Sequence, residues 1–294
     1  MKTTHPTVIN SHTGFRTLAR ALTVVENDLP GSADLLRGLH FDRNVPIIGV
    51  TGPPGAGKST LVNALINELV FPNKKVAVLA IDPTSPFNFG SLLGDRIRMA
   101  GHFNHPGVFI RSLATRGALG GLSAKTIEMT DMLRAAGFDY VLIETVGVGQ
   151  SEVEIAGLAD ITLVVLVPEG GDEIQTIKSG MMEIADAFIV NKADREGADV
   201  FANNLKKMAG QKEEAVPVFK TIASQSRGIA DVVEFIRSHA SSKNSRKEFL
   251  LAEKAYKLIQ QKRMSGIGRA KLQQAIAEAA DKPDFNLYKF IEQY

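Results

Sequence analysis

The chain of 294 residues has no cysteine and no tryptophan, and it has only four tyrosines. Because cysteine is absent, a disulfide scaffold, an iron–sulfur protein and a cysteine-ligated zinc site are excluded. Long apolar runs are missing as well. The longest clear run lies near Ile161–Val167, well short of the about 18 residues that a membrane span needs.

An excess of charge is also absent, because 34 basic and 32 acidic residues give a formal net charge of +2. Nucleic-acid and membrane surfaces usually require a clearly basic partner, so we expect no nucleic-acid partner and no membrane partner. Hydrophobic residues make up 44% of the chain, which excludes a disordered chain. Composition therefore predicts a soluble globular protein and leaves its function open.

The amino-terminal segment can be interpreted either as a transit peptide or as an ordered helix. The first 25 residues contain no Asp or Glu and several basic and hydroxyl residues, a composition typical of a transit peptide. Phe15, Leu18, Leu22 and Val25, however, follow the spacing of one face of an amphipathic helix. We predict that residues 1–45 form an ordered helical extension of a cytoplasmic protein, with the mitochondrial matrix as the alternative location.

Short apolar runs alternate with helix-like stretches from about residue 46. Several runs are continuously apolar, as strands buried on both faces of a parallel sheet must be. The alternation predicts an α/β fold over residues 46–240, with a mostly parallel sheet flanked by helices. The predicted strands are Ile47–Thr51, Val76–Ile81, Val108–Leu113, Tyr140–Thr145, Ile161–Val167, Ala187–Asn191 and Val216–Thr221. Helical candidates between them include Thr60–Leu69, Ser123–Ala136 and Val200–Met208.

The strand pattern stops after about Ala240. Residues 241–294 contain 11 basic and 6 acidic residues, so this segment carries +5 and the rest of the chain −3. Phe249, Ala252, Tyr256 and Ile259 follow a helical stripe. The positive charge fits a solvated helix face better than a contact with an acidic partner. We predict a helical carboxy-terminal arm over 241–294 that can instead form a homodimer through its apolar stripe.

The first predicted strand leads directly into the sequence GPPGAGKS, residues 52–59. Glycines let the backbone curl so that successive N–H groups form an anion nest, and the following helix adds its positive end. Lys58 is placed to bridge the β- and γ-phosphates, the Ser59 hydroxyl to ligate Mg²⁺, and Thr60 to contact the α-phosphate. The sequence therefore predicts a P-loop nucleotide site made of Gly52, Pro53, Pro54, Gly55, Ala56, Gly57, Lys58, Ser59 and Thr60.

A second motif, Asn191-Lys192-Ala193-Asp194, follows the sixth predicted strand. The Asp194 carboxylate can accept hydrogen bonds from guanine N1–H and the 2-amino group, which adenine cannot match. Asn191 can hold the base edge and tie it to the loop, and Lys192 can lay its stem over the ring. After the seventh strand, Ala223 and Ser224 belong to a loop that can give a backbone N–H to guanine O6. GTP and GDP are therefore favoured over adenine nucleotides.

Phosphoryl transfer to water needs charge neutralisation and a positioned nucleophile. Asp82 ends the second predicted strand, Glu144 lies near the end of the fourth, and Asp95 lies in a loop beyond the second. We assign Asp82 and Glu144 to a Mg²⁺ shell or its water, and Asp95 to a mobile switch. The N–H of Gly147 can reach the γ-phosphate.

The strings VTGPPGAGKSTL, LAIDPTSPF, LLGDRIRM, FDYVLIETVGVGQSE, GDEIQTIKSG and VNKAD, in this order, resemble the MeaB/ArgK family of P-loop GTPases. The resemblance implies a GTPase that escorts an adenosylcobalamin-dependent acyl-CoA mutase, chiefly methylmalonyl-CoA mutase. It further implies control of cofactor loading, protection of the mutase, and a homodimer built through the helical extension.

Carried over by position, the resemblance implies that Gly52–Thr60, Asn191, Lys192, Asp194 and Ala223 bind nucleotide. It also implies that Ser59, Asp82, Asp95 and Glu144 form the Mg²⁺ and hydrolysis group. Gly170–Gly180, which contains Lys178, would be a partner-sensing switch. The chain departs from the family at Ile222, which stands where Ser is usual, and more modestly at Thr84 and Thr176.

Two other functions remain open from the residues. A nickel-enzyme maturation GTPase would share the fold and the guanine site, but it normally carries a Cys/His metal cluster. This chain has no cysteine and six scattered histidines, and His102 and His105 are expected to be ordinary loop residues. The other alternative is a small-molecule kinase, for which no acceptor site can be identified in the sequence.

Overall fold

The computed structural model describes residues 8–41, 44–82, 99–114, 124–145, 155–168, 179–210, 215–240, 247–264, 266–281 and 285–294. The chain divides into two compact units, Met1–Leu250 and Leu251–Tyr294. Each unit is described by itself. Among the helices of these ranges, none is long and apolar enough to cross a membrane.

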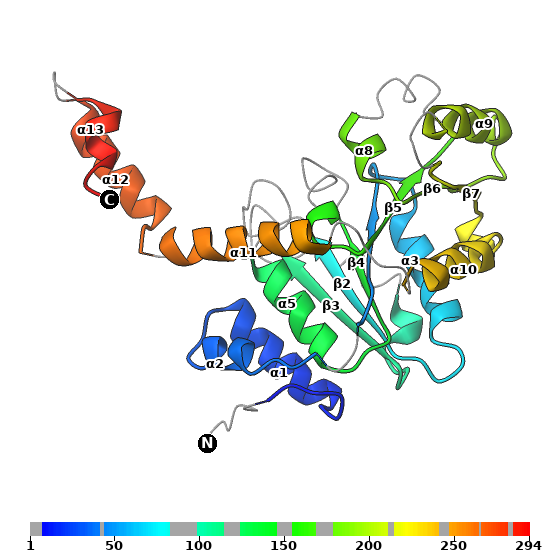
Figure 1. Ribbon diagram of the computed structural model, residues 1–294, viewed down its shortest axis with the longest axis horizontal. Coiled ribbons are helices and arrows are strands. Elements are labelled where there is room, and N and C mark those ends of the chain that lie inside the picture. The colour runs from blue at the N-terminus through cyan, green and yellow to red at the C-terminus, as the bar shows by residue number, and fades with distance from the viewer. Residues whose placement is uncertain are drawn as a thin grey trace. The chain divides into compact units, whose positions relative to one another are not determined.

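The first unit contains a seven-stranded parallel sheet in the order β3-β2-β4-β1-β5-β6-β7 (Figure 1). The α/β fold class with a parallel sheet is thus confirmed. Each predicted strand is present and each end lies within two residues of its predicted position. The strands are β1 Ile47–Thr51, β2 Val76–Asp82, β3 Val108–Ala114, β4 Tyr140–Glu144, β5 Ile161–Leu166, β6 Ala187–Val190 and β7 Val218–Lys220.

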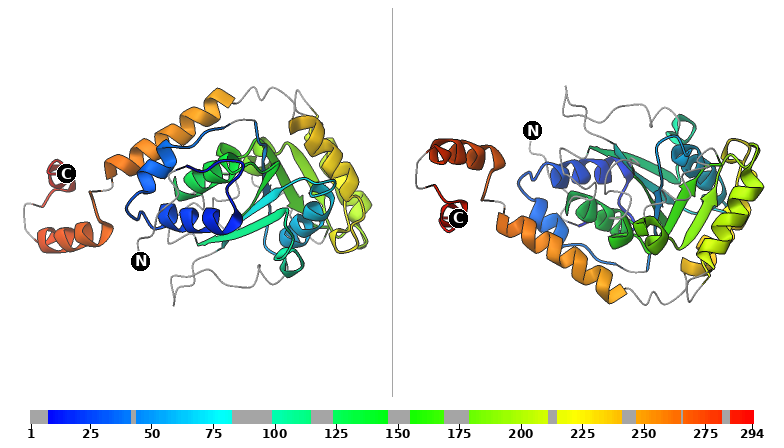
Figure 2. Two further views of the ribbon diagram at one scale, coloured as in Figure 1. Left: turned by 90° about the horizontal axis from the view of Figure 1, so that it is seen from below. Right: turned by 90° about the horizontal axis from the view of Figure 1, so that it is seen from above.

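Helices cover both faces of this sheet (Figure 2). α1 (Phe15–Glu26) packs with α2 (Ser32–Arg37) and α5 (Ala124–Ala135) on one face, and α3 (Lys58–Leu69) packs with α10 (Ile229–Ala240) on the other. Within the described ranges of the first unit, the further helices are α8 Ser179–Ile184 and α9 Ala198–Ala209, with short 3-10 turns at η1 Ala100–His102, η2 Ile155–Gly157 and η3 Ala223–Gln225. Because both faces are covered, all residues of β1, β5 and β6 are buried, which explains why these strands are apolar apart from Thr51 and Thr162.

The predicted amino-terminal helix is α1, and its stripe faces the body of the unit. Leu18, Leu22 and Val25 are fully buried, and the Phe15 ring lies 5.5 Å from that of Phe109 on β3. Aromatic pairs at such separations add to the stabilisation from burial. The helical extension therefore belongs to the same compact unit as the sheet, while its boundary at residue 45 remains a prediction.

The amino edge of the sheet repeats one hydrogen-bonding arrangement three times. Asp160, just before β5, donates its backbone N–H to the carbonyl of Ile47 at 2.8 Å and accepts the Ile47 N–H on its carboxylate at 2.8 Å. Asp139 pairs in the same way with Lys75, and Asp186 with Thr162. Each aspartate thus satisfies a strand-end N–H that the ladder leaves without a partner.

The second unit is helical. It holds most of α11 (Lys247–Met264), followed by α12 (Arg269–Ala280) and α13 (Leu287–Ile291). Asn286 caps α13, because its side chain accepts hydrogen bonds from the N–H groups of Tyr288 and Lys289. The proposed domain boundary at residue 241 remains a prediction.

Candidate functional site: the carboxyl edge of the sheet

Parallel strands bring all their carboxyl ends to one edge, and ligands of open α/β sheets bind there. The P-loop follows β1, Glu144 ends β4, Asn191 follows β6 and Thr221 follows β7. Since β4 and β1 are neighbours in the sheet, residues far apart in sequence meet at this edge. The fold therefore brings the predicted P-loop, the carboxylate Glu144 and the NKAD motif to one side of the sheet.

The P-loop has the backbone conformation that its glycines allow. Gly52, Gly55 and Gly57 have φ values of +139°, +78° and +85°. A Cβ at Gly57 would lie 2.5 Å from Asn191 Nδ2, and one at Gly52 would overlap the carbonyl oxygen of Val165. Only glycine fits both the left-handed backbone and this close approach.

The helix α3 begins at Lys58, and its N-cap Gly57 offers no side-chain acceptor. The first N–H groups of such a helix are available for an anion. Lys58 is 7% exposed, and its Nζ donates to the carbonyl oxygens of Gly52 and Pro53 at 2.9 and 3.0 Å. The Lys58 ammonium group therefore lies against the backbone of the loop that would hold the phosphates.

Ser59 and Glu144 meet behind the loop. Ser59 Oγ donates to Glu144 Oε1 at 2.6 Å, and the two residues are 5% and 4% exposed. Hydroxyl and carboxylate oxygens are hard ligands of the kind that Mg²⁺ takes, and Mg²⁺ usually fills its other positions with water and phosphate oxygens. The pair thus fits a Mg²⁺ site next to bound phosphates. Within the described ranges, no group of three or more His, Cys, Asp or Glu residues could hold a metal by itself.

Several predicted site residues are outside this description. Asp82 ends β2 beside β4 at the same edge, but its side chain is not among the described ones. Asp95, Gly147, Thr84, Thr176 and Lys178 lie outside the described residues, as do the glycine-rich segments around them. Their roles stay predictions.

The side chain of Asn191, which follows β6, hydrogen-bonds to the P-loop and to the loop after β7. Its Nδ2 donates to the carbonyl of Ala56 at 3.0 Å. Its Oδ1 accepts from the Thr221 hydroxyl at 3.2 Å and from the N–H of Ala223 at 3.1 Å. The side chain therefore ties the P-loop to the loop after β7, and the Ala223 N–H proposed for guanine O6 is bonded to Asn191 in this structure.

Around Asn191, the other predicted base-binding residues lie closer to solvent. Lys192 has a left-handed backbone with φ +54°, and Asp194 and Ser224 are exposed. An exposed carboxylate remains able to receive the two donors of guanine. Ile222 is 8% exposed, and its N–H donates to the carbonyl of Arg227 at 3.0 Å, so this position serves the fold of the loop.

Three threonines at the edge were not predicted to matter. Thr221 holds Asn191, and the hydroxyl of Thr145 donates to that of Thr51 at 3.0 Å. The available sequence signal is that each threonine stands at the end of a strand or directly after it. Threonine is also common in strands because of its β propensity. This signal therefore does not distinguish a threonine that holds the site from one that only forms part of a strand.

The predicted loop histidines lie away from this edge. His102 is 8% exposed in η1, and burial is the main reason that its pKa lies below 6.5. His105 accepts a hydrogen bond from the N–H of Gly107 through Nδ1 at 3.1 Å. Both residues have structural surroundings, in agreement with the sequence analysis.

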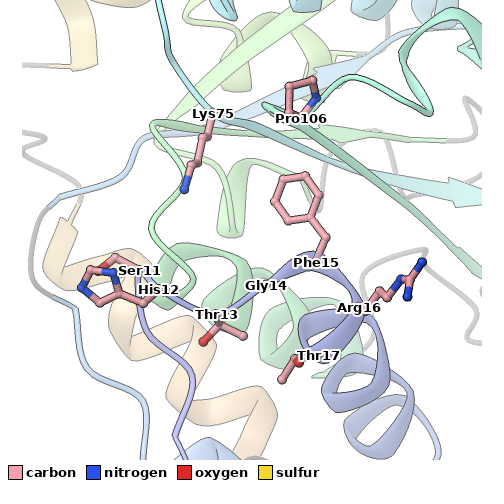
Figure 3. Close-up of a pocket in the computed structure, with 9 residues that line it drawn as sticks. All are labelled: Ser11, His12, Thr13, Gly14, Phe15, Arg16, Thr17, Lys75 and Pro106. Atoms are coloured by element: carbon pink, nitrogen blue, oxygen red, sulfur yellow. The ribbon is translucent and has the colours of Figure 1, made fainter.

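A cavity of about 600 Å³ lies at the opposite, amino edge of the sheet, and Figure 3 shows the residues that line it. It lies between the start of α1, at Phe15 and Arg16, and the turns before β2 and β3, at Lys75 and Pro106. None of its lining residues comes from the P-loop or the NKAD motif. This cavity is therefore not the nucleotide site.

The family model for "Methylmalonyl Co-A mutase-associated GTPase MeaB" matches residues 18–280. The chain belongs to the MeaB family of GTPases. As a member of the MeaB family it is an enzyme that binds GTP and GDP and hydrolyses GTP. The resemblance seen in the sequence is thus confirmed.

Individual relatives agree with membership of the MeaB family. A GTPase of Pyrococcus horikoshii is 43% identical over 295 residues, covering 95% of this chain and 91% of the relative. The fused isobutyryl-CoA mutase of Geobacillus kaustophilus is 38% identical over 194 residues, which are 63% of this chain and 18% of that protein. A crystal structure of a LAO/AO transport system kinase superposes with a TM-score of 0.65 at 28% identity, covering 91% of this chain and 82% of that one.

Proposed function

We propose that this MeaB-family GTPase is a chaperone of an adenosylcobalamin-dependent acyl-CoA mutase of the methylmalonyl-CoA mutase type. Its GTP cycle would gate the loading of the cofactor and protect the mutase. The observation that carries the proposal is the match to a mutase-associated family together with a relative in which a similar segment lies within a fused isobutyryl-CoA mutase.

The chemistry at the site is GTP hydrolysis. The water oxygen forms a bond to the γ-phosphorus, and the bond to the β,γ-bridging oxygen breaks, leaving its electron pair on GDP. Lys58 and the first N–H groups of α3 neutralise charge that develops on the phosphate oxygens. Glu144 orients water through a hydrogen bond, with Ser59 as its neighbour at 2.6 Å.

Mg²⁺ is part of this proposal. Ser59 and Glu144 would hold it directly or through water, with Asp82 and Asp95 as further candidates. When bound, Mg²⁺ would supply positive charge that neutralises the negative charge of the phosphate oxygens. The buried Ser59 hydroxyl and Glu144 carboxylate support the assignment.

A homodimer is the second part of the proposal. On α11, Leu251, Tyr256 and Ile259 are 53–65% exposed, and on α13, Leu287 and Tyr288 are 50% and 77% exposed. Such exposed apolar side chains favour burial against another copy. Sedimentation velocity would test it: wild type should be a dimer, and Tyr256→Glu with Ile259→Glu should be monomeric. Monomeric wild type at micromolar concentration would reject the dimer.

The test of the main proposal uses the full chain and a purified adenosylcobalamin-dependent methylmalonyl-CoA mutase. We expect the mutase to raise the GTPase rate, and loading of adenosylcobalamin, followed by its absorbance, to depend on GTP and not on GDP. Lys58→Ala should abolish both effects, and the exposed Lys206→Ala on α9 is the matched control. If the mutase neither binds nor changes the rate, the chaperone role is wrong.

The same preparation separates the alternatives. Labelled γ-phosphate recovered on a metabolite instead of as free phosphate would favour a kinase. Stoichiometric Ni²⁺ binding in equilibrium dialysis would favour a metal-delivery GTPase. Cytoplasmic location, or the mitochondrial matrix in a eukaryote, stays a prediction.

A further inference from the structure

Two buried threonines join the ends of β1 and β4. Thr145 Oγ1 donates to Thr51 Oγ1 at 3.0 Å, and the residues are 2% and 0% exposed. Thr51 is the last residue of β1, and Thr145 directly follows β4. The backbone N–H of Thr145 also donates to the carbonyl of Val50 at 3.1 Å. This hydroxyl pair, called the threonine bridge here, connects the two strands at the point where β1 ends.

The threonine bridge lies next to the groups of the nucleotide site. Thr51 directly precedes Gly52, the first residue of the P-loop, and Thr145 directly follows Glu144. Val50 and Glu144 are partners in the parallel register of β1 and β4. Successive side chains of a strand point to opposite faces, so the bridge lies on the face opposite to the Ser59–Glu144 pair. The strand ends are thus fixed from both faces of the sheet.

The position of Glu144 relative to Ser59 depends on this connection. Ser59 is carried by the P-loop and α3, which continue from β1, while Glu144 is carried by β4. A shift of one strand end along the other would change the 2.6 Å separation of Ser59 Oγ and Glu144 Oε1. A buried hydroxyl pair resists such a shift, because the shift would break a hydrogen bond in the interior of the protein.

We propose that Thr51 and Thr145 are positioning residues that hold Glu144 against Ser59 and thereby set the response of the site to Mg²⁺. The inference rests on the proposed role of Ser59 and Glu144 in Mg²⁺ binding. We assign the bridge no direct contact with phosphate or base. We expect the bridge to affect how strongly Mg²⁺ changes nucleotide affinity. The loops proposed to bind guanine are held by the hydrogen bonds of Asn191, which do not involve the bridge.

The experiment compares wild type, Thr145→Val, Thr145→Ser and the double variant Thr51→Val/Thr145→Val. Affinity for a fluorescent GDP is measured in EDTA and over a Mg²⁺ titration, and hydrolysis of GTP is followed in a single turnover. Thermal unfolding reports stability. Thr130→Val on α5 is the matched control, because Thr130 is also fully buried and its hydroxyl donates to the carbonyl of Thr126 at 2.7 Å.

Thr145→Val is expected to raise the Mg²⁺ concentration for half-maximal effect and to slow hydrolysis, each by about tenfold to a hundredfold, as small misplacements at a reacting site do. GDP affinity in EDTA should stay within about twofold of wild type, since only the coupling to Mg²⁺ changes. Thr145→Ser should restore both values, because serine keeps the hydroxyl. Thr130→Val should lower only the unfolding temperature.

The double variant distinguishes a defect in Mg²⁺ response from a loss of stability. Replacing both hydroxyls by methyl groups removes both polar atoms of the bridge, so the double variant should be no less stable than Thr145→Val while the Mg²⁺ defect persists. If the Mg²⁺ titration of Thr145→Val or of the double variant matches wild type, the positioning role is wrong and the proposed Mg²⁺ site stands. If wild-type GDP affinity does not respond to Mg²⁺, the Mg²⁺ site is wrong and this inference falls with it.

Discussion

Ser59 Oγ donates a hydrogen bond to Glu144 Oε1 at 2.6 Å across 85 residues of sequence. Ser59 is the second residue of α3, next to the P-loop, and Glu144 is the last residue of β4, so the contact joins the phosphate-binding element to the neighbouring strand. Both residues are almost fully buried. This relationship supports the proposed role of Glu144 toward Mg²⁺ or water.

Glu144→Gln should spare nucleotide binding and slow hydrolysis by about a hundredfold, since the neutral amide keeps the size of the side chain and loses its charge and basicity. Affinity for a fluorescent GTP analogue and the single-turnover rate measure the two effects. Glu68→Gln, at an exposed position of the same α3, is the control. Loss of binding in Glu144→Gln would make Glu144 a structural residue.

Asp194→Asn should weaken the preference for guanine and improve binding of xanthine nucleotides. The carboxylate accepts from the N1–H and the 2-amino group, whereas the amide can donate to the xanthine 2-oxo group. Discrimination through such paired hydrogen bonds amounts to about 1–3 kcal/mol for each unsatisfied group. Competition between GDP and XDP measures it, with the exposed Asp231→Asn as control. An unchanged GDP/XDP ratio would contradict the assignment.

Asp160→Ala should lower the free energy of unfolding by about 1–3 kcal/mol, because the Ile47 N–H loses its carboxylate partner at the buried start of β1. Urea unfolding of the two proteins gives the difference. Asp34→Ala on α2, at an exposed position, should change stability by less than about 0.5 kcal/mol. Equal stabilities of Asp160→Ala and wild type would show that the arrangement contributes little.

His102 should make the protein less stable in mild acid. Its pKa lies below 6.5, first because of burial and also because of the nearby His105 charge, while a hydrogen bond with the backbone of Asn63 acts in the opposite direction. The folded state therefore binds fewer protons than the unfolded state, and the stability present above about pH 6.5 is lost as the pH falls through the lowered pKa.

Unfolding temperatures measured from pH 7.5 to 5.0 test this expectation. His102→Gln should show a shallower loss of stability with falling pH than wild type, and the exposed His12→Gln should follow wild type. A parallel decline in all three proteins would assign the acid sensitivity to other groups.

The positions of the strands could be predicted because their signal is local. A strand buried on both faces must be almost entirely apolar, so β1 and β5 can be recognised as short apolar runs. The end of such a run is less certain. The seventh strand was expected from Val216 but begins at Val218, after Pro217, which has no N–H to donate to a ladder.

The contacts of individual site residues could not be predicted in the same way. Asn191 was expected to hold the base edge and tie it to the loop, yet its amide is bonded to Ala56, Thr221 and Ala223. Ala56 lies 135 residues away in sequence. No local pattern encodes such a bond, because it depends on which strands are neighbours in the sheet. The threonine bridge between Thr51 and Thr145 was missed for the same reason.

By itself, the sequence determined the α/β class, the P-loop and the preference for GTP. These follow from apolar runs, from glycines that a tight phosphate turn requires, and from the functional groups of a few adjacent residues. Only the tertiary structure decided that Glu144 meets Ser59 and that Thr145 meets Thr51, because both contacts require β4 to lie directly beside β1. Strand order is set by the packing of the whole sheet and its helices, and no segment of the chain determines it alone.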